Sequence, residues 1–268
     1  MSIYHITLLA IVQGVTEFLP ISSSGHLILA SRVLELPDQS LVIDVAVHVG
    51  TLFAVMVYFW RDIFALGVGL VRLLVGRRDP RSRLVFLLVI ATLPVIAAGF
   101  LFSRYLPHGL RGVELVAWAT IGFAIVLWIA DRLGMTVRRI ENLGYGNALF
   151  IGLSQVLALI PGTSRAGITM TAGRMLGMER IEAARFSMLL SVPTIIGAGA
   201  LKGSALIQSG DIALQISAVI ATILAFVTGM LSIAIMMRWL RKSSFAPFVI
   251  YRIALGGGLL AWIYFSAG

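Results

Sequence analysis

The chain contains no cysteine and little charge. The lack of cysteine excludes disulfide bonds and thiolate metal ligands. Only 12% of the 268 residues are charged, whereas soluble domains carry about 25%. Hydrophobic residues make up 59% of the chain. This composition predicts an integral membrane protein.

Positive charge exceeds negative charge, with 21 Lys and Arg against 12 Asp and Glu. In a soluble protein this excess would suggest a nucleic-acid partner. Here the arginines gather between apolar runs, as in RRDPRSR at 77–83. Cytoplasmic loops of membrane proteins carry such an excess. We therefore expect these loops to be cytoplasmic, and we expect no nucleic-acid partner.

A polar segment interrupts the first apolar stretch of the chain. Gln13–His26 reads QGVTEFLPISSSGH. Gln13 and Glu17 are four residues apart and share one helical face, and Pro20 cannot continue that helix. The segment could be a helix–turn–helix joint capped by serine, or it could supply reacting groups. Because ionisable groups at membrane depth are costly and tend to be functional, the second interpretation is favoured.

The apolar limbs beside this break, 3–19 and 27–33, are both short. A membrane-spanning helix needs about 20 residues, so the two limbs predict a re-entrant helical hairpin. Irregular backbone at that depth is tolerated where it is buried in protein or lines a wet cavity. The break is therefore a candidate cavity wall.

A second broken stretch resembles the first. PGTSRAG at Pro161–Gly167 separates an apolar run at 145–160 from a short limb at 168–177. Setting Leu19–Ser23 beside Ile160–Ser164 gives a weak repeat, which places Ser22 opposite Thr163. We expect a second re-entrant hairpin.

Three longer apolar runs follow each hairpin, at 41–60, 84–103, 113–130, 183–201, 212–240 and 248–265. An odd number of spans between the hairpins gives the two halves opposite orientation in the membrane. The sequence therefore predicts an all-α integral membrane fold with six transmembrane helices plus two re-entrant helical hairpins in an inverted-topology repeat. We expect a single membrane domain at 1–268, with repeat one at about 1–131 and repeat two at about 143–268.

In inverted-repeat folds, broken helices meet near the midplane and direct helix ends at an anionic ligand. The two breaks would bring together a set of polar side chains: Glu17, Ser22, Ser23, Ser24, His26, Thr163, Ser164, Arg165 and Thr169. The guanidinium of Arg165 suits bidentate binding of phosphate, although it could instead form a structural ion pair with Glu17. With backbone N–H groups beside the glycines, this set favours phosphoryl transfer.

Asp44 and His48 are four residues apart in the run at 41–60 and share one helical face. They could form an interfacial polar end of that helix. Alternatively, they could form a second wall of the active cavity.

These residues are similar to motifs of the bacterial undecaprenyl-pyrophosphate phosphatases, also called the bacitracin-resistance family. The first family motif, Glu or Gln, three residues and Glu, stands here as Gln13-Gly-Val-Thr-Glu17, followed by Ser22-Ser-Ser-Gly-His26. The second, PGxSRSxxT, stands as Pro161-Gly-Thr-Ser-Arg-Ala-Gly-Ile-Thr169, with Ala166 in place of a serine. With HVGTLFAVMVYFWRDIF at 48–64, the resemblance covers essentially the whole chain.

The resemblance implies a multi-pass hydrolase of the bacterial inner (plasma) membrane, with its active site toward the periplasm or cell exterior. Such an enzyme cleaves the diphosphate anhydride of undecaprenyl pyrophosphate, a polyprenyl diphosphate lipid, to undecaprenyl phosphate and phosphate. This reaction recycles the lipid carrier for peptidoglycan and confers bacitracin resistance. The resemblance also implies the same fold and a homodimer.

The resemblance assigns roles to the site residues. Either Ser23 attacks phosphorus with His26 as base, or His26 attacks directly, while Arg165 stabilises the transferring group. Glu17 orients His26 or binds a divalent cation, Mg²⁺ or Ca²⁺. The expected substrate-binding residues are Gln13, Ser22, Ser24, Gly162, Thr163, Ser164 and Thr169.

A different class of function also fits an inverted repeat with paired broken helices, because transporters use that architecture. The protein could be a transporter or flippase of undecaprenyl phosphate or a related anionic lipid, with Arg165 binding only the headgroup. The serines and the histidine beside Arg165 favour the enzyme, because a carrier needs no nucleophile.

Overall fold

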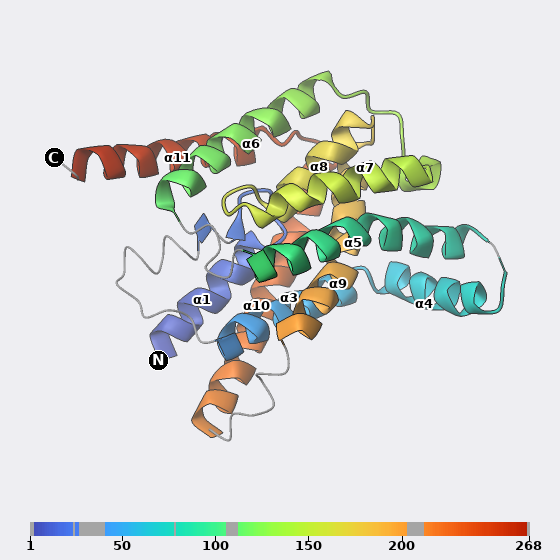
Figure 1. The fold of residues 1–268 in the computed structure, drawn as a ribbon, viewed down its shortest axis with the longest axis horizontal. Coiled ribbons are helices and arrows are strands. Elements are labelled where there is room, and N and C mark those ends of the chain that lie inside the picture. The colour runs from blue at the N-terminus through green and yellow to red at the C-terminus, as the bar shows by residue number, and fades with distance from the viewer. Residues whose placement is uncertain are drawn as a thin grey trace.

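The computed structural model describes residues 3–23, 25–26, 41–77, 79–105, 112–202 and 212–266, and the elements it contains in these ranges are helical (Figure 1). The limb expected at 27–33 and the side chain of Ser24 lie outside the described residues. The α-helices are α1 Ile3–Thr16, α3 Leu41–Tyr58, α4 Trp60–Leu74, α5 Pro80–Tyr105, α6 Val113–Leu133, α7 Tyr145–Val156, α8 Arg165–Met175, α9 Arg180–Lys202, α10 Ile212–Leu240 and α11 Ala246–Ser266.

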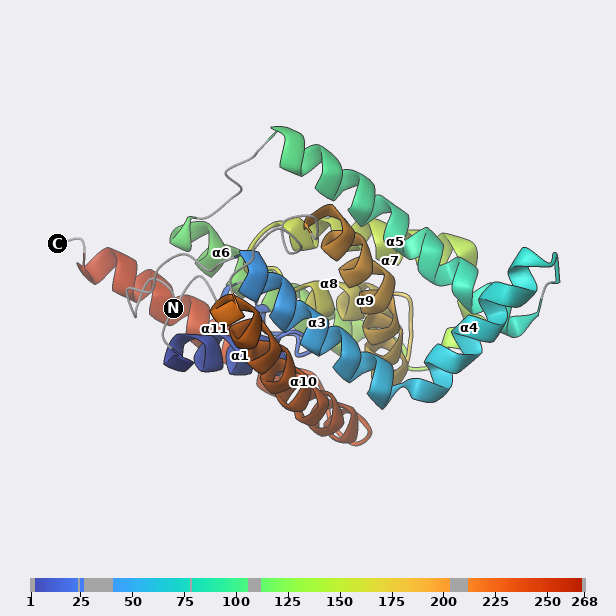
Figure 2. The same ribbon diagram turned by 90° about the horizontal axis from the view of Figure 1, so that it is seen from below.

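Five of the described helices are long and apolar enough to cross a membrane, namely α5, α6, α9, α10 and α11. A sixth span is reached if α3 and α4 are taken together, but they meet at 90° (Figure 2). The all-helical membrane architecture expected from composition is therefore confirmed. Pro94 lies inside α5 and does not end it, because the helix runs through this proline from Pro80 to Tyr105.

Both breaks have the same backbone geometry. Ser22 and Ser164 adopt φ of 75° and 70°, which is uncommon for residues other than glycine. The Oγ of Ser22 accepts the N–H of Gly25 at 3.3 Å, and the Oγ of Ser164 accepts the N–H of Gly167 at 3.1 Å. Ser22 thus corresponds to Ser164, so the sequence alignment of Ser22 with Thr163 was wrong by one residue.

The helices pack in pairs that recur between the two halves of the chain. The short helix α1 packs against α10, and the short helix α7 packs against α5. Likewise α3 packs against α10, and α9 packs against α5 (Figure 2). Glycine allows the close approaches: a Cβ on Gly14 would lie 1.9 Å from Thr228 Oγ1, and one on Gly152 would lie 2.6 Å from the Ala91 oxygen.

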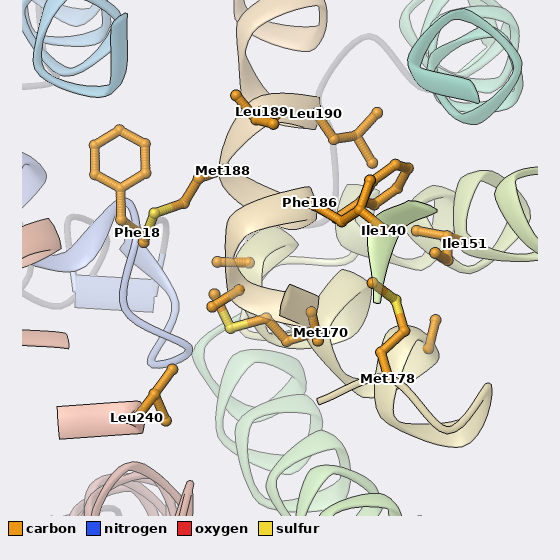
Figure 3. Packing of buried hydrophobic residues seen from close by; sticks show 14 of the residues in the cluster. Phe18, Ile140, Ile151, Met170, Met178, Phe186, Met188, Leu189, Leu190 and Leu240 are labelled. Carbon is orange, nitrogen blue, oxygen red and sulfur yellow. The ribbon is translucent and has the colours of Figure 1, made fainter. Parts of the chain in front are cut away.

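Buried apolar side chains fill the space between the two breaks. Phe18, just after α1, lies beside Met188 of α9, and Phe186 of α9 points toward Ile140 and Ile151 (Figure 3). Phe18 is 0% exposed. This core fixes the position of the first break relative to α9.

A charged cluster of Asp131, Arg174 and Arg180 lies where α6 ends and α9 begins. Asp131 Oδ1 accepts hydrogen bonds from Arg174 Nε at 3.1 Å and Arg180 Nε at 2.7 Å, and its Oδ2 accepts the N–H of Phe245 at 3.3 Å. Arg174 also donates to four backbone carbonyls, those of Asp131, Gly134, Met135 and Met178. The cluster ties α6, α8, α9 and the start of α11 together.

Candidate active site

Glu17 is the centre of the polar groups contributed by the first break. Its Oε2 accepts hydrogen bonds from Gln13 Nε2 at 2.8 Å and from Ser23 Oγ at 3.1 Å. Its Oε1 accepts one from Arg165 Nη2 at 3.1 Å. Its side chain is only 8% exposed. Glu17 therefore contacts Ser23 and Arg165 directly, which brings three of the four predicted catalytic residues together.

Arg165 is the first residue of α8, directly after the N-cap Ser164. Its Nη1 donates a hydrogen bond to the Ser187 oxygen of α9 at 3.2 Å, and this bond holds the guanidinium against α9. The ion pair with Glu17 that the sequence left as one interpretation is present. Since both partners also line a cavity, the guanidinium is held where an entering anion would meet it.

The cavity has a volume of about 330 Å³ and lies between α3 and α9. Of the two interpretations of Asp44 and His48, the second cavity wall matches the structure, since both line it. His48 Nδ1 lies 2.7 Å from the Asp44 backbone oxygen, and its Nε2 lies 3.2 Å from Gln13 Nε2. With Nδ1 as donor, His48 Nε2 accepts from the Gln13 amide. The lining residues are Glu17, Ser23, Asp44, Val45, His48, Val49, Leu52, Ala158, Ser164, Arg165, Thr194, Ile195, Ile196, Ala198 and Gly199.

His26 lies to one side of this group. Its Nδ1 is 2.6 Å from the Ser22 oxygen and its Nε2 is 2.7 Å from the Tyr251 hydroxyl. Its ring stacks on Tyr251 of α11 with 5.6 Å between centroids. The structure thus places His26 with Tyr251, and Ser23 with Glu17.

The other predicted binding residues of the second break differ in their positions. Ser164 lines the cavity. Thr163 is fully buried, and Gly162 adopts φ of 96° in the turn. Thr169 Oγ1 lies 2.6 Å from Ser187 Oγ and 2.9 Å from the Arg165 oxygen. It therefore links the first turn of α8 to α9.

Sequence reasoning missed Arg252, a fully buried residue of α11. Its guanidinium donates to backbone oxygens of both breaks: Pro20 at 3.4 Å, Gly162 at 2.9 Å and Thr163 at 2.9 Å. Its Nε donates to the Thr120 oxygen at 3.2 Å. The available signal was an arginine inside the apolar run at 248–265. Its planar fork holds both breaks at a fixed separation.

The donor set at the cavity suits a hard divalent cation shared with a ligand. Two carboxylates, Glu17 and Asp44, line the cavity, and the buried Oε1 of Gln13 has no hydrogen-bond partner among the described residues. Mg²⁺ is usually held by one or two carboxylates together with substrate phosphates. In the described part of the chain no group of three or more His, Asp and Glu could hold a metal by itself. The residues therefore fit a cation that also binds a phosphate.

These features define a helical membrane protein with a buried carboxylate–arginine–serine site between two broken helices. The family described as bacitracin resistance protein BacA matches residues 6–258. Among curated relatives, undecaprenyl-diphosphatase 1 of Rhodospirillum rubrum is 49% identical, covering 98% of this chain and 96% of that protein. The undecaprenyl-diphosphatase of Ruegeria pomeroyi is 48% identical, covering 98% of this chain and 100% of that protein, and that of Hahella chejuensis is 48% identical over 97% and 98%.

The chain therefore belongs to the bacitracin resistance protein BacA family. The match extends over both broken stretches and every described helix that lines the cavity.

Proposed function

We propose that this protein is an undecaprenyl-diphosphatase, which hydrolyses undecaprenyl diphosphate to undecaprenyl phosphate and phosphate. Family membership supports the substrate, since three relatives at 48–49% identity carry that name. The observation that carries the proposal is the contact of Ser23, Glu17 and Arg165 at one cavity. Through this reaction the protein recycles the lipid carrier of peptidoglycan synthesis and confers bacitracin resistance.

The first step of the proposed reaction is attack by Ser23 Oγ on the terminal phosphorus. The bond from that phosphorus to the bridging oxygen breaks, and undecaprenyl phosphate leaves. Arg165 faces the transferring group and neutralises its developing charge, which is the main task of the protein in phosphoryl transfer. Water then cleaves the phosphoserine ester, releasing phosphate and restoring Ser23.

The arrangement favours Glu17 as the base for this step. Ser23 Oγ already donates a hydrogen bond to Glu17 Oε2 at 3.1 Å, which is the reach that general-base catalysis requires. His26 as base or as nucleophile stays a prediction of the resemblance. In that alternative, the imidazole would exchange its Tyr251 contact for one with Ser23 or phosphorus.

A cation, Mg²⁺ or Ca²⁺, is part of the proposal. Glu17 would hold it, and Asp44 also lines the cavity. When bound, such an ion neutralises diphosphate charge and polarises the phosphoryl oxygens.

The proposed architecture is the inverted repeat of two re-entrant hairpins and six spans, with repeats at about 1–131 and 143–268. The exchanged helix pairs, α1 with α10 and α7 with α5, support it. So does the shared geometry of Ser22 and Ser164. We place the arginine-rich loops in the cytoplasm, which directs the cavity mouth to the periplasmic or outer face.

The test is phosphate release from undecaprenyl diphosphate by purified protein in detergent, with and without EDTA. The Arg165→Ala variant is measured beside it, and circular dichroism checks that it remains folded. Release that depends on Arg165 supports the phosphatase, and loss of release in EDTA supports the cation. No release by folded wild-type protein would contradict the proposal. The molar mass of the same sample by light scattering, corrected for detergent, tests the expected homodimer.

A second candidate function is supported by the exchanged helix pairing, because inverted repeats with broken helices are typical of transporters. The protein would then move undecaprenyl phosphate or a related anionic lipid across the bilayer. Liposomes that contain a labelled lipid phosphate separate the two functions. Transbilayer movement without phosphate release would favour the carrier.

A further inference from the structure

The cavity combines polar groups with an apolar wall. Helix α3 contributes Asp44 and His48 together with the apolar Val45, Val49 and Leu52, and Ile195, Ile196 and Ala198 of α9 form much of the apolar wall. The two helices pack against each other, so these residues border one opening. A ligand with a charged head and a hydrocarbon tail would match this combination.

The apolar wall reaches the surface of the protein. Ile196 lines the cavity and is 54% exposed. It belongs to a helix whose segment Arg180–Gly199 is long and apolar enough to cross a membrane. With α9 spanning the membrane, this exposed isoleucine would face lipid, and the cavity would open to the bilayer on the α9 side.

Gly199 leaves this opening unobstructed. A Cβ added there would meet no heavy atom within 4 Å, whereas one added at Gly197 would lie 2.9 Å from Ile96 Cδ1 of α5. A Cβ at Gly197 would thus press on the end of the Ile96 side chain, which would have to move. Gly199 instead borders open space at the cavity edge.

We propose that Ile196, Ala198 and Gly199 form the passage through which the polyprenyl chain of the lipid leaves the cavity and enters the bilayer. The diphosphate remains at Arg165 and Ser23. The cavity of about 330 Å³ is at the small end of ligand pockets, so it encloses the headgroup and the start of the chain, while the remainder must leave. This inference rests on the proposed function.

The passage would affect the lipid chain by the space that it leaves for the chain, and not by hydrophobic attraction. The chain is surrounded by lipid before and after binding, and lipid tails are as apolar as leucine. Narrowing the passage should therefore impair long-chain lipids selectively. A diphosphate whose chain ends inside the cavity should be unaffected.

A competing apolar groove of about 450 Å³ lies between α1, α10 and α11, with Val15, Leu19 and Trp239 in its lining. None of Glu17, Ser23 and Arg165 lines it. The fully buried ring of Phe18 stands in the segment that joins Glu17 to Leu19. The α9 passage is favoured because it is continuous with the phosphate-binding end of the cavity.

The first test compares Gly199→Leu with Gly257→Leu. Gly257 is an exposed position of α11 where a Cβ would also meet nothing within 4 Å, so it is a matched control. The substrates are undecaprenyl diphosphate and dimethylallyl diphosphate. We expect Gly199→Leu to lower kcat/KM about tenfold or more for the long lipid, since even one methylene in a tight site changes rates at that scale. Dimethylallyl diphosphate turnover should not change, and Gly257→Leu should affect neither substrate.

An equal loss on both substrates, or no loss on the long lipid, would overturn the passage. A second measurement does not need turnover. A methylene-diphosphonate analogue of the lipid, with a diazirine on its second isoprene unit, is crosslinked to the wild-type protein and the labelled peptide is identified. Label on residues 195–199 supports the passage, and label at Trp239 or Phe248 in the competing groove overturns it. Wild-type protein that fails to hydrolyse but crosslinks at 195–199 would refute the proposed function alone.

Discussion

The two ends of α8 hold arginine–carboxylate clusters built from the same chemistry but hydrogen-bonded to different degrees. Near the C-terminal end, Arg174 shares Asp131 with Arg180 of α9 and also donates to backbone carbonyls. At the N-terminal end, Arg165 donates to Glu17 and to one carbonyl of α9. Arg165 and Glu17 line the cavity between α3 and α9, whereas Arg174 and Asp131 are not part of its lining.

The difference separates a structural cluster from a reactive one. A buried ion pair contributes little net stability unless further hydrogen bonds satisfy it, and those bonds surround Arg174. Around Arg165 the cavity provides space for a ligand. Burial of charge alone therefore does not identify a site, whereas burial of charge beside a cavity with a serine hydroxyl does.

The largest expected effect is on activity at the open cluster, the Arg165–Glu17 pair that lines the cavity. Arg165→Ala should lower kcat by about 10³-fold or more, the scale found when a transition-state arginine is removed. Its thermal midpoint in detergent should change less than that of an Asp131 variant, because Gln13 and Ser23 still donate to Glu17. Phosphate-release kinetics and a melting curve on one preparation measure both. A fully active Arg165→Ala would remove the contrast between the clusters.

The next effect is on stability at the closed cluster, which Asp131, Arg174 and Arg180 form. Asp131→Ala leaves two arginines facing each other with Arg174 fully buried, so unfolding free energy should fall by about 3–5 kcal/mol. The kcat of the fraction that folds should stay near wild type, because the cavity is lined by other residues. Denaturant titration in mixed micelles checks stability. A selective fall in kcat without loss of stability would show that this cluster takes part in the reaction.

A smaller effect is expected at the edge of the open cluster. Tyr251→Phe removes the hydroxyl 2.7 Å from His26 Nε2. One hydrogen bond contributes about 1 kcal/mol to stability, so the free energy of unfolding should fall by about that amount. Because the proposed base for Ser23 is Glu17, kcat should stay near wild type. Phenylalanine retains the stacking, which isolates the hydroxyl. Denaturant titration and phosphate-release kinetics measure the two quantities, and a kcat changed by about tenfold or more would mean that His26 takes part in the reaction.

The smallest effect is expected at the edge of the closed cluster. Arg180 is 29% exposed, whereas Arg174 is 1% exposed. Partly exposed ion pairs contribute roughly 0–1 kcal/mol, and Asp131 retains Arg174 as a partner. Arg180→Ala should therefore shift the melting temperature only slightly and leave kcat unchanged. A loss as large as that of Asp131→Ala would mean that Arg180, and not Arg174, holds the cluster together.

Local signals in the sequence were sufficient for much of this account. Low charge predicted the membrane helices, and proline and glycine marked both breaks. Ionisable residues at those breaks predicted that Glu17, Ser23 and Arg165 meet. Such inferences succeed because a bilayer penalises unpaired charge and irregular backbone wherever no function or partner requires them.

Long-range packing accounts for what the sequence could not predict. Tyr251 lies far along the chain from His26, and Arg252 contacts both breaks from α11, so neither contact has a local signal. The bend of 90° between α3 and α4 falls at Phe59, at the end of the apolar run predicted for 41–60, but that run gives no signal that the chain continues as a second helix at that angle. The register of Ser22 with Ser164 depends on backbone φ and on a cap hydrogen bond, which a match of proline positions does not reveal.

The central claim is that Ser23, held by Glu17 and faced by Arg165, receives the phosphoryl group. Its most direct test is rapid quenching of wild-type protein with undecaprenyl diphosphate labelled on the terminal phosphate. Parallel acid and alkaline quenches preserve phosphoserine and phosphohistidine, respectively, and mass spectrometry locates the label. We predict acid-stable label on Ser23 that is absent in Ser23→Ala. Alkali-stable label on His26, or label on any other residue, would contradict the account.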